Sequence, residues 1–360
     1  MQRAGIHKIA KLAGVSIGTV DRALHGRAGI SDATRKKVLA IAAKMQYRPN
    51  PAARILAVGR PHLRIGVCIP QEIHFFYDQM RAGIFDEAER THGLGVEVVY
   101  RPVRNLGDVR GARVAELAAE KVNAIVVVPG DPKSVTPAIN AAERQGVRVI
   151  CLTTDAPRSR RSSVVCVDPE LNGRLAAELM AKFLSPGSQA AVVTGMLTAE
   201  EHRLKAKGFR EGFERDFGHG KMVEILEAHE SEVESYNKTR RLLKQYPALE
   251  GIYVSTVNSL PVCKALHEAP DGARIKLITT DVFPEILPHF RRGTIGASIY
   301  QDPYLQGQTA VRMLVDHWLH NTPIPAGHYL NPVVVLRTNL HLFREVQAVN
   351  KSKKTAGTTK

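Results

Sequence analysis

Residues 6–26 read IHKIAKLAGVSIGTVDRALHG, a pattern that predicts two short helices joined by a tight turn. Gly14 allows the chain reversal that a bulkier residue would resist, and Ser16 is a good N-cap for a second helix over residues 17–24. The apolar residues of the first helix recur at the spacing of one buried helical stripe; they are Ile6, Ile9, Ala10 and Ala13.

The second predicted helix has an apolar face and an outward face. The apolar face comprises Val20, Ala23 and Leu24, and the outward face comprises Thr19, Asp21 and Arg22. A third amphipathic helix follows, with Ser31 as its cap. Because three short helices bury little surface, we expect the exposed face of the second helix to have a binding function. Insertion into the DNA major groove, as in a helix-turn-helix, supplies one; an ordinary helical hairpin is the alternative.

The net charge of the chain favours the DNA-binding interpretation. Residues 1–60 hold twelve lysines and arginines but only two acidic residues, Asp21 and Asp32. The last ten residues add four lysines and no acid. Almost all of the formal charge of +15 therefore lies near the two ends of the chain. A basic patch on a helix-turn-helix is typical of a surface that contacts DNA phosphates.

Three motifs of the first 56 residues make the chain resemble the lactose/galactose-repressor family of bacterial transcription regulators. They are A-x-x-A-G-V-S-x-x-T-V-x-R-x-L from Ala10, S-x-x-T-R-x-x-V from Ser31, and Y-x-P-N-x-x-A-R-x-L from Tyr47. The resemblance extends over about residues 4–345. It implies a DNA-binding head over residues 1–48, whose contact residues are Ser16, Ile17, Gly18, Thr19, Asp21, Arg22 and His25.

Residues 49–61 form the first predicted domain boundary. Pro49 and Pro51 break the third helix, and the short stretch over residues 52–58 is too brief to be a stable helix alone. A plain linker is one interpretation. The resemblance implies instead a hinge helix that orders on DNA, with Leu56 as a wedge in the minor groove and Asn50 and Ala53 at neighbouring contact positions.

The composition fits a chain with more than one domain and a sizeable core, since 44% of 360 residues are hydrophobic. We expect no signal peptide and no membrane span. Four scattered cysteines without a C-x-x-C pair indicate free thiols in a reducing compartment, the cytoplasm. The sequence predicts neither a metal site nor a cofactor. Residues 347–360 are polar and basic, and we expect this tail to be disordered.

From residue 62 onward, short apolar runs alternate with helical patterns, which predicts an α/β domain with parallel sheets covered on both faces. The expected strands are 63–69, 96–100, 124–128, 147–152, 190–194, 251–255, 275–279, 294–299 and 332–336. Expected helices include 76–92, 134–145, 173–183, 199–217 and 232–246. The resemblance implies a two-lobed, periplasmic-binding-protein-like, doubly wound fold for residues 62–346. It places the crossings between lobes near residues 162–166, 292–296 and 324–330.

Polar side chains at the ends of the expected strands nominate a ligand site, since open α/β sheets bind ligands beyond the carboxyl ends of their strands. The candidates are Phe75, Phe76, Asp131, Asp155, Asn258, Asp281 and Gln301. Aromatic rings that stack on an apolar face, with amides and carboxylates for hydroxyl groups, suit a sugar or polyol. For any single residue the alternative is structural, because an aspartate after a strand is often a helix cap.

The resemblance supports the His74–Phe76 run, with Phe75 and Phe76, as well as Asp281 and Gln301 as ligand contacts, and it adds Lys205, where the family usually has arginine. Lysine cannot make the bidentate fork of arginine, so the geometry of a relative's ligand does not transfer. At Val167-Asp168-Pro169 the family commonly has Asp-Asn, and Pro169 offers no side-chain hydrogen bond. At Asp21 the family usually has serine.

These observations predict a dimeric or tetrameric repressor that binds a double-stranded DNA operator and responds to a small sugar or polyol. A non-sugar effector and an activator role are open alternatives with the same fold. Sugar-transport proteins share the lobes but lack the basic head. Enzymes are disfavoured because the chain has no G-x-S-x-G elbow, H-E-x-x-H motif, P-loop or G-x-G-x-x-G loop.

Overall fold

The computed structural model describes residues 6–24, 29–45, 47, 62–217 and 220–343. They fall into two compact units that divide between residues 61 and 62. The predicted hinge with Asn50, Ala53 and Leu56, the predicted contact residue His25 and the basic tail all lie outside the described residues.

The first unit is a bundle of three helices, α1 (Ile6–Ala13), α2 (Ile17–Leu24) and α3 (Asp32–Lys44). Ile9, Val20 and Val38 are fully buried at its centre. Gly14 adopts a φ of 68° in the turn between α1 and α2, the left-handed conformation that glycine tolerates best. The backbone N–H of Thr19 donates to Ser16 Oγ at 3.1 Å, which confirms Ser16 as the cap of α2.

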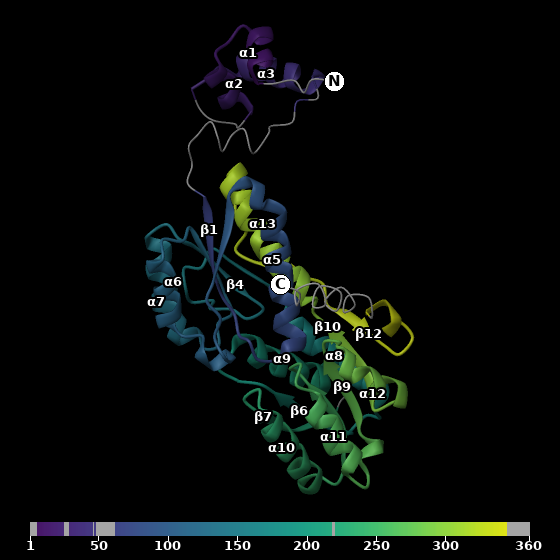
Figure 1. The fold of residues 1–360 in the computed structure, drawn as a ribbon. Helices are drawn as coiled ribbons and strands as arrows, with labels where there is room; N and C mark the ends of the chain where they lie inside the picture. The colour runs from purple at the N-terminus through teal and green to yellow at the C-terminus, as the bar shows by residue number, and fades with distance from the viewer. Residues whose placement is uncertain (1–5, 25–28, 46, 48–61, 218–219, 344–360) are drawn as a thin grey trace, which may run out of the picture. The chain divides into compact units, whose positions relative to one another are not determined.

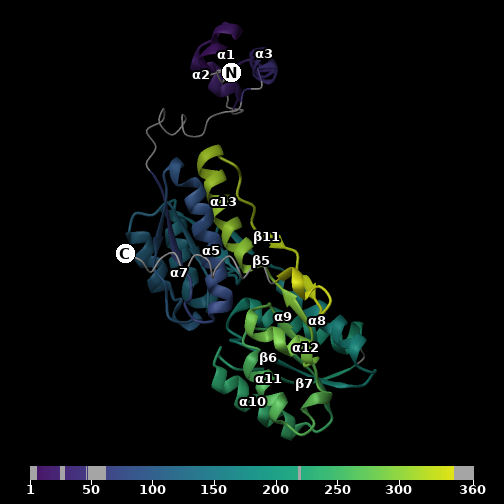
Figure 2. The same cartoon turned by 45° about the vertical axis from the view of Figure 1, so that its right-hand side comes forward.

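The second unit contains two six-stranded sheets with the same strand order (Figure 1, Figure 2). The first sheet runs β11-β5-β4-β3-β1-β2, and the second runs β12-β10-β9-β8-β6-β7. All pairings are parallel except that of β10 with β12. The first sheet comprises β1 (Leu63–Cys68), β2 (Val96–Tyr100), β3 (Ala124–Val127), β4 (Arg148–Leu152), β5 (Ser163–Val167) and β11 (His328–Leu330). The second comprises β6 (Gln189–Thr194), β7 (Lys221–Glu227), β8 (Leu249–Val254), β9 (Lys276–Thr280), β10 (Ile295–Tyr300) and β12 (Val333–Val335).

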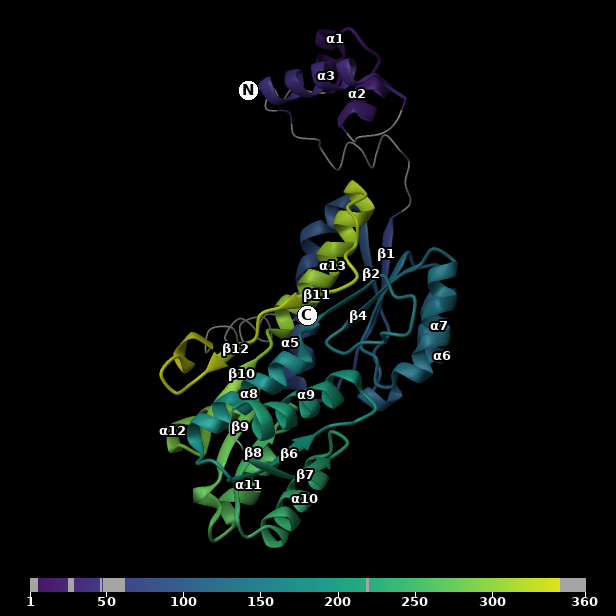
Figure 3. The same ribbon diagram turned by 180° about the vertical axis from the view of Figure 1, so that it is seen from behind.

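Helices cover both faces of each sheet, which makes two lobes (Figure 1, Figure 3). In the first lobe, α6 (Gly111–Ala119) and α7 (Pro132–Arg144) pack on one face, and α5 (His74–Thr91) and α13 (Pro303–His320) on the other. In the second lobe, α8 (Pro169–Phe183) and α9 (Glu200–Glu211) cover one face. The other face carries α10 (Glu232–Gln245), α11 (Leu260–Glu268) and α12 (Leu287–Arg292). All four cysteines are free and buried, as predicted.

Glycines let one helix pair of each lobe approach closely. A Cβ on Gly83 of α5 would lie 2.0 Å from the carbonyl oxygen of Tyr304 in α13. In the second lobe, a Cβ on Gly173 of α8 would lie 2.1 Å from the carbonyl oxygen of Lys205 in α9. Because no real Cβ contact is that short, these helix crossings require glycine. The crossing at Gly173 also fixes where α9 presents Lys205 to the space between the lobes.

The chain crosses between lobes three times, each time directly after a strand ends. The crossings lie at Asp168 after β5, at residues 301–302 after β10 and at residues 331–332 after β11. The expected positions near 162–166, 292–296 and 324–330 are therefore wrong by a few residues. The physical reason is that the carboxyl ends of the parallel strands face the other lobe, so the chain must complete each strand before it crosses.

The strands expected from the sequence are all present, with ends that shift by at most two residues. Three further strands, β5, β7 and β11, had not been expected. The long helix expected over residues 199–217 is divided into α9 and a π-helical turn at Gly212–Asp216. None of the helices formed by the described residues combines the length and apolar character needed to cross a bilayer.

Candidate functional site

The first unit exposes one face of α2 and a set of cations. Ile17 is 43% exposed, and Gly18 and Arg22 are exposed beside it. Ser16 and Thr19 also belong to the predicted contact set, but the hydroxyl groups of these two residues bond each other at 2.9 Å. The three helices also carry exposed cations; they are Lys8, Lys11, Arg22, Lys36, Lys37 and Lys44.

Asp21 differs from its predicted placement. The sequence pattern places it on the outward face of α2, but the residue is half-buried. Burial raises the pKa of the Tyr47 phenol, and the Asp21 carboxylate raises that pKa further, so the two groups lie near each other. Asp21 is therefore partly covered, as Thr19 is, and its assignment as a base contact stays a prediction.

The second unit brings the strand ends of both lobes to one place. In each sheet the strand order reverses, between β1 and β3 in the first lobe and between β6 and β8 in the second. A doubly wound sheet binds ligands at this reversal, outside the carboxyl ends of the strands. Because the chain crosses between lobes directly after strands end, the two reversal points open toward the same interlobe space.

A small cavity lies in this interlobe space, with a volume of about 20 Å³. That is room for about one water molecule, whereas small-molecule sites measure about 300–1,000 Å³, so the lobes must separate before a sugar can enter. The first lobe contributes Ile73, Phe76 and Tyr77 to its walls. The second lobe and the crossing contribute Glu201, His202, Lys205, Glu230, Thr256, Val257, Asp281 and Gln301. Of the predicted ligand contacts, the cavity thus unites Phe76, Lys205, Asp281 and Gln301.

Unusual backbone conformations cluster around this cavity. Ile73, Glu230 and Asp281 line it with φ angles of 51°, 57° and 63°. Thr153, after β4, and Asp302, after β10, also have positive φ. A positive φ is rare outside glycine and is an outlier for a β-branched residue such as Ile73 or Thr153. Residues in such conformations cost free energy and concentrate at binding sites, where surrounding contacts hold them.

Asp281 is bonded to the segment that crosses between the lobes. Its Oδ1 accepts the backbone N–H of Gln301 at 2.8 Å, and its Oδ2 accepts Gln301 Nε2 at 2.7 Å. Burial raises the pKa of Asp281 to about 6, although the hydrogen bonds from Gln301 and the charge of Lys205 oppose that shift. A group that binds Asp281 therefore acts directly on a crossing between the lobes.

Lys205 and Glu201 form a buried ion pair on α9. Lys205 is 1% exposed, and its ammonium donates to Glu201 Oε1 and, at 3.3 Å, to the carbonyl oxygen of Ser255. Both residues line the cavity. The predicted ligand contact Lys205 thus has protein partners of its own, and its position close to Asp281 is fixed by them.

Glu230 and His202 form the opposite end of the polar wall. Thr256 Oγ1 lies 2.7 Å and 2.9 Å from the two oxygens of Glu230, and His202 Nε2 lies 3.3 Å from its Oε1. Gly195 makes room for them, since a Cβ there would lie 1.9 Å from Glu230 Oε1. Neither Glu230 nor His202 was among the ligand contacts predicted from the sequence.

Four predicted ligand residues have other contacts and do not line the cavity. Phe75 stacks on Phe283 with ring centroids 4.1 Å apart. Asp131 accepts the backbone N–H of Lys133 and caps α7, whereas Asp155 forms a bidentate pair with Arg161. Asn258 Nδ2 lies 3.5 Å from Ser235 Oγ. These contacts therefore support a structural role for the four residues, which was the alternative to ligand binding.

Several interlobe contacts hold the two lobes together. The stack of Phe75 on Phe283 joins α5 to the second lobe. Thr198 Oγ1 donates to the carbonyl oxygen of Gly130 at 3.3 Å. The backbone N–H of Glu201 donates to Thr154 Oγ1 at the same distance. The lobes are thus closed on the cavity, and a ligand reaches it when they separate.

Glu72 provides a pH-dependent test of this arrangement. Burial raises the pKa of Glu72 to about 7, with a further rise from Glu230 of the other lobe. Because the folded-state pKa lies above that of the unfolded chain, the contribution of Glu72 to stability is present at low pH and is lost as pH rises through about 7. We expect Glu72→Gln to raise stability at pH 8 and to leave it unchanged at pH 5.

Urea unfolding followed by the fluorescence of Trp318, the single tryptophan, measures this effect. The glutamine can still accept the backbone N–H of Leu106, which donates to Glu72 Oε1 at 2.6 Å. Glu89→Gln, at an exposed position of α5, is the matched control and should show no pH-dependent gain. An equal effect of Glu72→Gln at both pH values would contradict the assignment.

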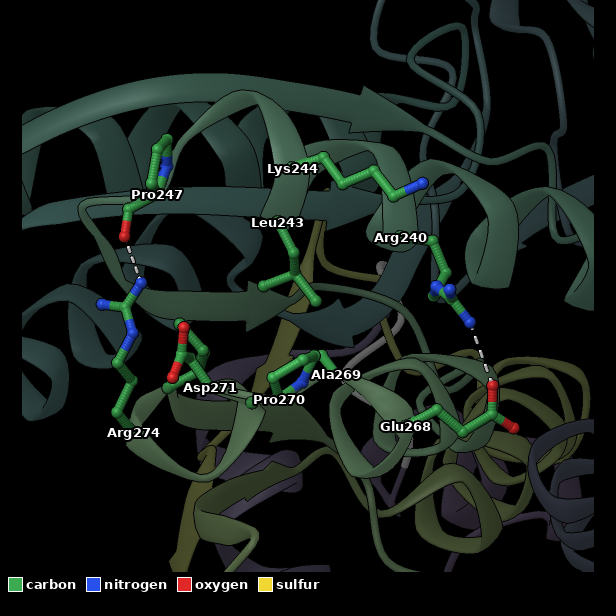
Figure 4. A pocket seen from close by; sticks show the side chains of 11 residues that line it. Arg240, Leu243, Lys244, Pro247, Glu268, Ala269, Pro270, Asp271 and Arg274 are labelled. Carbon is green, nitrogen blue, oxygen red and sulfur yellow. Dashed lines mark hydrogen bonds and ion pairs between the residues drawn. The ribbon is translucent and has the colours of Figure 1, made fainter.

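A second pocket, of about 610 Å³ with its open volume included, lies away from the strand ends (Figure 4). It is built by α10 and the loop after α11. Its arginines are already engaged, Arg240 with Glu268 at 3.2 Å and Arg274 with the carbonyl oxygens of Leu249 and Pro247. This pocket is larger than the interlobe cavity, but it lacks contributions from the first lobe and cannot report lobe closure. Among the described residues, no group of three or more His, Cys, Asp or Glu side chains could hold a metal ion.

Comparisons with known proteins match both units. Residues 65–322 match the family model of the periplasmic binding protein domain, and residues 5–50 match that of the bacterial regulatory proteins, lacI family. The lactose operon repressor of Escherichia coli is 26% identical over 355 residues, covering 97% of this chain and 94% of the repressor. Catabolite control protein A of Streptococcus mutans is 25% identical over 315 residues, covering 86% of this chain and 90% of that protein.

Among solved structures, the glucose-galactose binding protein GanP of Geobacillus stearothermophilus superposes with a TM-score of 0.71. It is 26% identical and covers 78% of this chain and 99% of its own. The two-lobed architecture is therefore that of sugar-binding proteins. The three-helix head is additional to it.

Proposed function

Because the chain belongs to the periplasmic binding protein domain family and carries a lacI-family head at residues 5–50, we propose that it is a ligand-controlled transcription repressor. It binds DNA through its head, and a small sugar or polyol in the interlobe cavity controls that binding. The observation that carries the proposal is the pair of hydrogen bonds from Gln301 to Asp281. These bonds connect the wall of the cavity to a segment that crosses between the lobes.

The head supports reading of the major groove by α2. Its exposed face offers Arg22, whose guanidinium can bond a guanine edge, and Ile17, which can contact a thymine methyl group. Exposed lysines of α1 and α3 suit phosphates. The hinge assignment of Asn50, Ala53 and Leu56 remains a hypothesis of the sequence resemblance.

Control by the ligand follows from linkage. A ligand shifts DNA affinity only as far as its affinities for the two lobe arrangements differ. The cavity has walls from both lobes, so a ligand that touches Tyr77 and Asp281 together binds the closed arrangement more tightly than the open one. Closure changes the angle between the lobes at the three crossings, and we propose that this movement alters DNA binding by the head.

We further propose that the protein acts in the cytoplasm as a homodimer, or a tetramer, on a near-palindromic operator. Two heads related by a two-fold axis read two half-sites, and the symmetry of the protein sets their spacing. Sedimentation of the protein with and without operator DNA tests this assembly.

Selection from randomised duplex DNA, followed by titration of the selected operator, tests the proposed function. A single preferred sequence with two related half-sites supports it, and binding without sequence preference contradicts it. Repeating the titration with sugars and polyols identifies the effector. Loss of operator binding on addition of a sugar supports a repressor that the effector releases, and tighter binding indicates a co-repressor.

Arg22→Ala is expected to weaken operator binding by about 1–3 kcal/mol and to relax the preference at one base pair per half-site. The reason is that Arg22 is the long cationic side chain on the exposed face of α2. Randomised-operator selection with the variant measures both effects. Lys37→Ala, at an exposed position of α3, is the control: it should lower affinity for every sequence alike. An unchanged preference in Arg22→Ala would rule out base reading by this residue.

A further inference from the structure

The polar wall of the interlobe cavity is unusually rich in carboxylates. The side chains of Glu201 and Glu230 are 10% and 4% exposed, and Asp281 is 3% exposed as a whole residue. All three residues line the cavity. The one lysine that lines it is Lys205. The first lobe adds only Ile73, Phe76 and Tyr77, none of which carries a positive charge. The cavity as a whole is therefore negatively charged.

Most hydrogen-bond donors of the cavity wall already bond acceptors of the protein. The Lys205 ammonium donates to Glu201 and Ser255. The backbone N–H and the side-chain amide of Gln301 both donate to Asp281. The hydroxyl of Thr256 lies within bonding distance of both oxygens of Glu230. What the wall offers a ligand is thus mainly acceptors.

One carboxylate oxygen of the cavity wall has only a long contact with an imidazole within the described part of the chain. Glu201 is 8% exposed, and its Oε1 is bound by Lys205. Its Oε2 makes no hydrogen bond, and the nearest cationic or imidazole nitrogen is His202 Nε2 at 3.7 Å. His202 Nδ1 accepts the backbone N–H of Met196 at 2.9 Å, so Nε2 carries the proton and directs it to Glu230 Oε1 at 3.3 Å.

A carboxylate oxygen with so long a contact can accept a hydrogen bond from a ligand, and a charged donor satisfies it best. The His202 imidazole lies near both Glu201 Oε2 and Glu230 Oε1, so a ligand cation would approach these carboxylates from the cavity that both residues line. The neighbouring ring of Phe76 and the Tyr77 hydroxyl suit the apolar face and the hydroxyl groups of a sugar ring.

We propose that the effector is a polyhydroxylated primary amine, an amino sugar, whose ammonium group binds the carboxylate wall that Glu201 and Glu230 form. The inference rests on the proposed function, since it names the ligand class of the same cavity. It sets this chain apart from its structural relatives, whose names refer to neutral sugars such as glucose, galactose and arabinose.

Matched sugars test the proposal with the full-length protein. Thermal shift and calorimetric titration compare glucosamine, galactosamine and mannosamine with glucose, galactose and mannose and with the three N-acetyl derivatives. We expect one of the amines to raise the melting temperature and to bind about tenfold or more tightly than its neutral counterparts. That amine should also change the affinity for the selected operator.

Glu230→Gln tests the charge itself, because the amide keeps the size of the side chain and can still bond Thr256 and His202. The variant should lose about tenfold or more affinity for the amine and keep its affinity for neutral sugars. Its melting temperature without ligand reports whether it folds. Glu200→Gln, on the same helix as Glu201 but paired with Arg203 at the surface, should bind the amine like the parent protein.

The outcomes separate the two levels of the proposal. A neutral sugar that binds as tightly as its amine, or an equal loss for amine and neutral sugar in Glu230→Gln, overturns the amino-sugar inference and leaves a sugar-controlled repressor in place. If none of the nine sugars binds, both the amino-sugar inference and the sugar as effector fail. Operator binding then still tests the DNA-binding function on its own.

Discussion

Lys205→Met is expected to lower the stability of the two-lobed unit by about 3–5 kcal/mol, because it leaves Glu201 as a buried carboxylate without its partner. Lys205 is 1% exposed and Glu201 is 8% exposed, so little water is available to compensate the carboxylate for the lost ammonium. Urea unfolding at pH 7.5, followed by Trp318 fluorescence, measures the change. This is the largest effect on stability that we expect from a single substitution near the cavity.

A double-mutant cycle isolates the ion pair. The double variant Lys205→Met with Glu201→Gln should recover much of the lost stability, since it removes the uncompensated charge as well. Lys207→Met is the matched control on the same helix, where an exposed pair with Glu170 at 3.1 Å contributes at most about 1 kcal/mol. If Lys205→Met is as stable as the parent and only loses ligand binding, Lys205 is a ligand contact and not a structural cation.

The helix-turn-helix could be predicted almost completely from the sequence because its determinants are local. The 3.6-residue period identified Ile9 and Val20 as core residues, and the structure buries both. Ser16 was recognised as a cap by its position before the second helix, and its hydroxyl accepts from Thr19 as expected. Asp21 lies near Tyr47 and is half-buried, a tertiary contact that the period of α2 does not reveal.

The lobes were predictable to the extent that strand runs are continuous and apolar. Strand β5 was overlooked because the resemblance placed a crossing over the same residues, whereas SVVCV is itself a buried β-branched run. Strand β7 was overlooked because it mixes charged and apolar residues, with Lys221, Glu224 and Glu227 among them. That omission also hid Glu230, which follows the end of β7 and would have been nominated by the rule applied to the other strands.

Strand ends alone could not separate ligand contacts from caps and ion pairs. Asp131, Asp155 and Asp281 all follow strands, yet they differ in their partners. Asp131 caps its own helix, and Asp155 binds Arg161 a few residues later, so short-range geometry decides their roles. Asp281 instead bonds Gln301, twenty positions away and on another strand end. Such a partnership depends on the register of β9 with β10, which the sequence does not encode locally.

Asp281→Ala is expected to weaken binding of the effector about ten- to a hundredfold, equivalent to roughly 1–3 kcal/mol. Two losses act in the same direction. Ligand groups that bond the carboxylate lose their acceptor, and the N–H groups of Gln301 lose theirs at the crossing between the lobes. Both losses penalise the closed arrangement to which the ligand binds. Calorimetric titration with the sugar selected by thermal shift measures the affinity.

Two controls sharpen the interpretation of Asp281→Ala. Asp281→Asn keeps an oxygen that can accept the Gln301 N–H and tolerates the φ of 63°, so it should lose less affinity than alanine. Asp271→Ala removes an exposed carboxylate of the same lobe at the other pocket and should change nothing. Operator affinity without effector should stay close to that of the parent protein, because the head is untouched. The variant would then remain in its ligand-free regulatory state at sugar concentrations that switch the parent. Normal sugar binding by Asp281→Ala, or loss of operator binding before any sugar is added, would mean that Asp281 does not couple the cavity to the crossing.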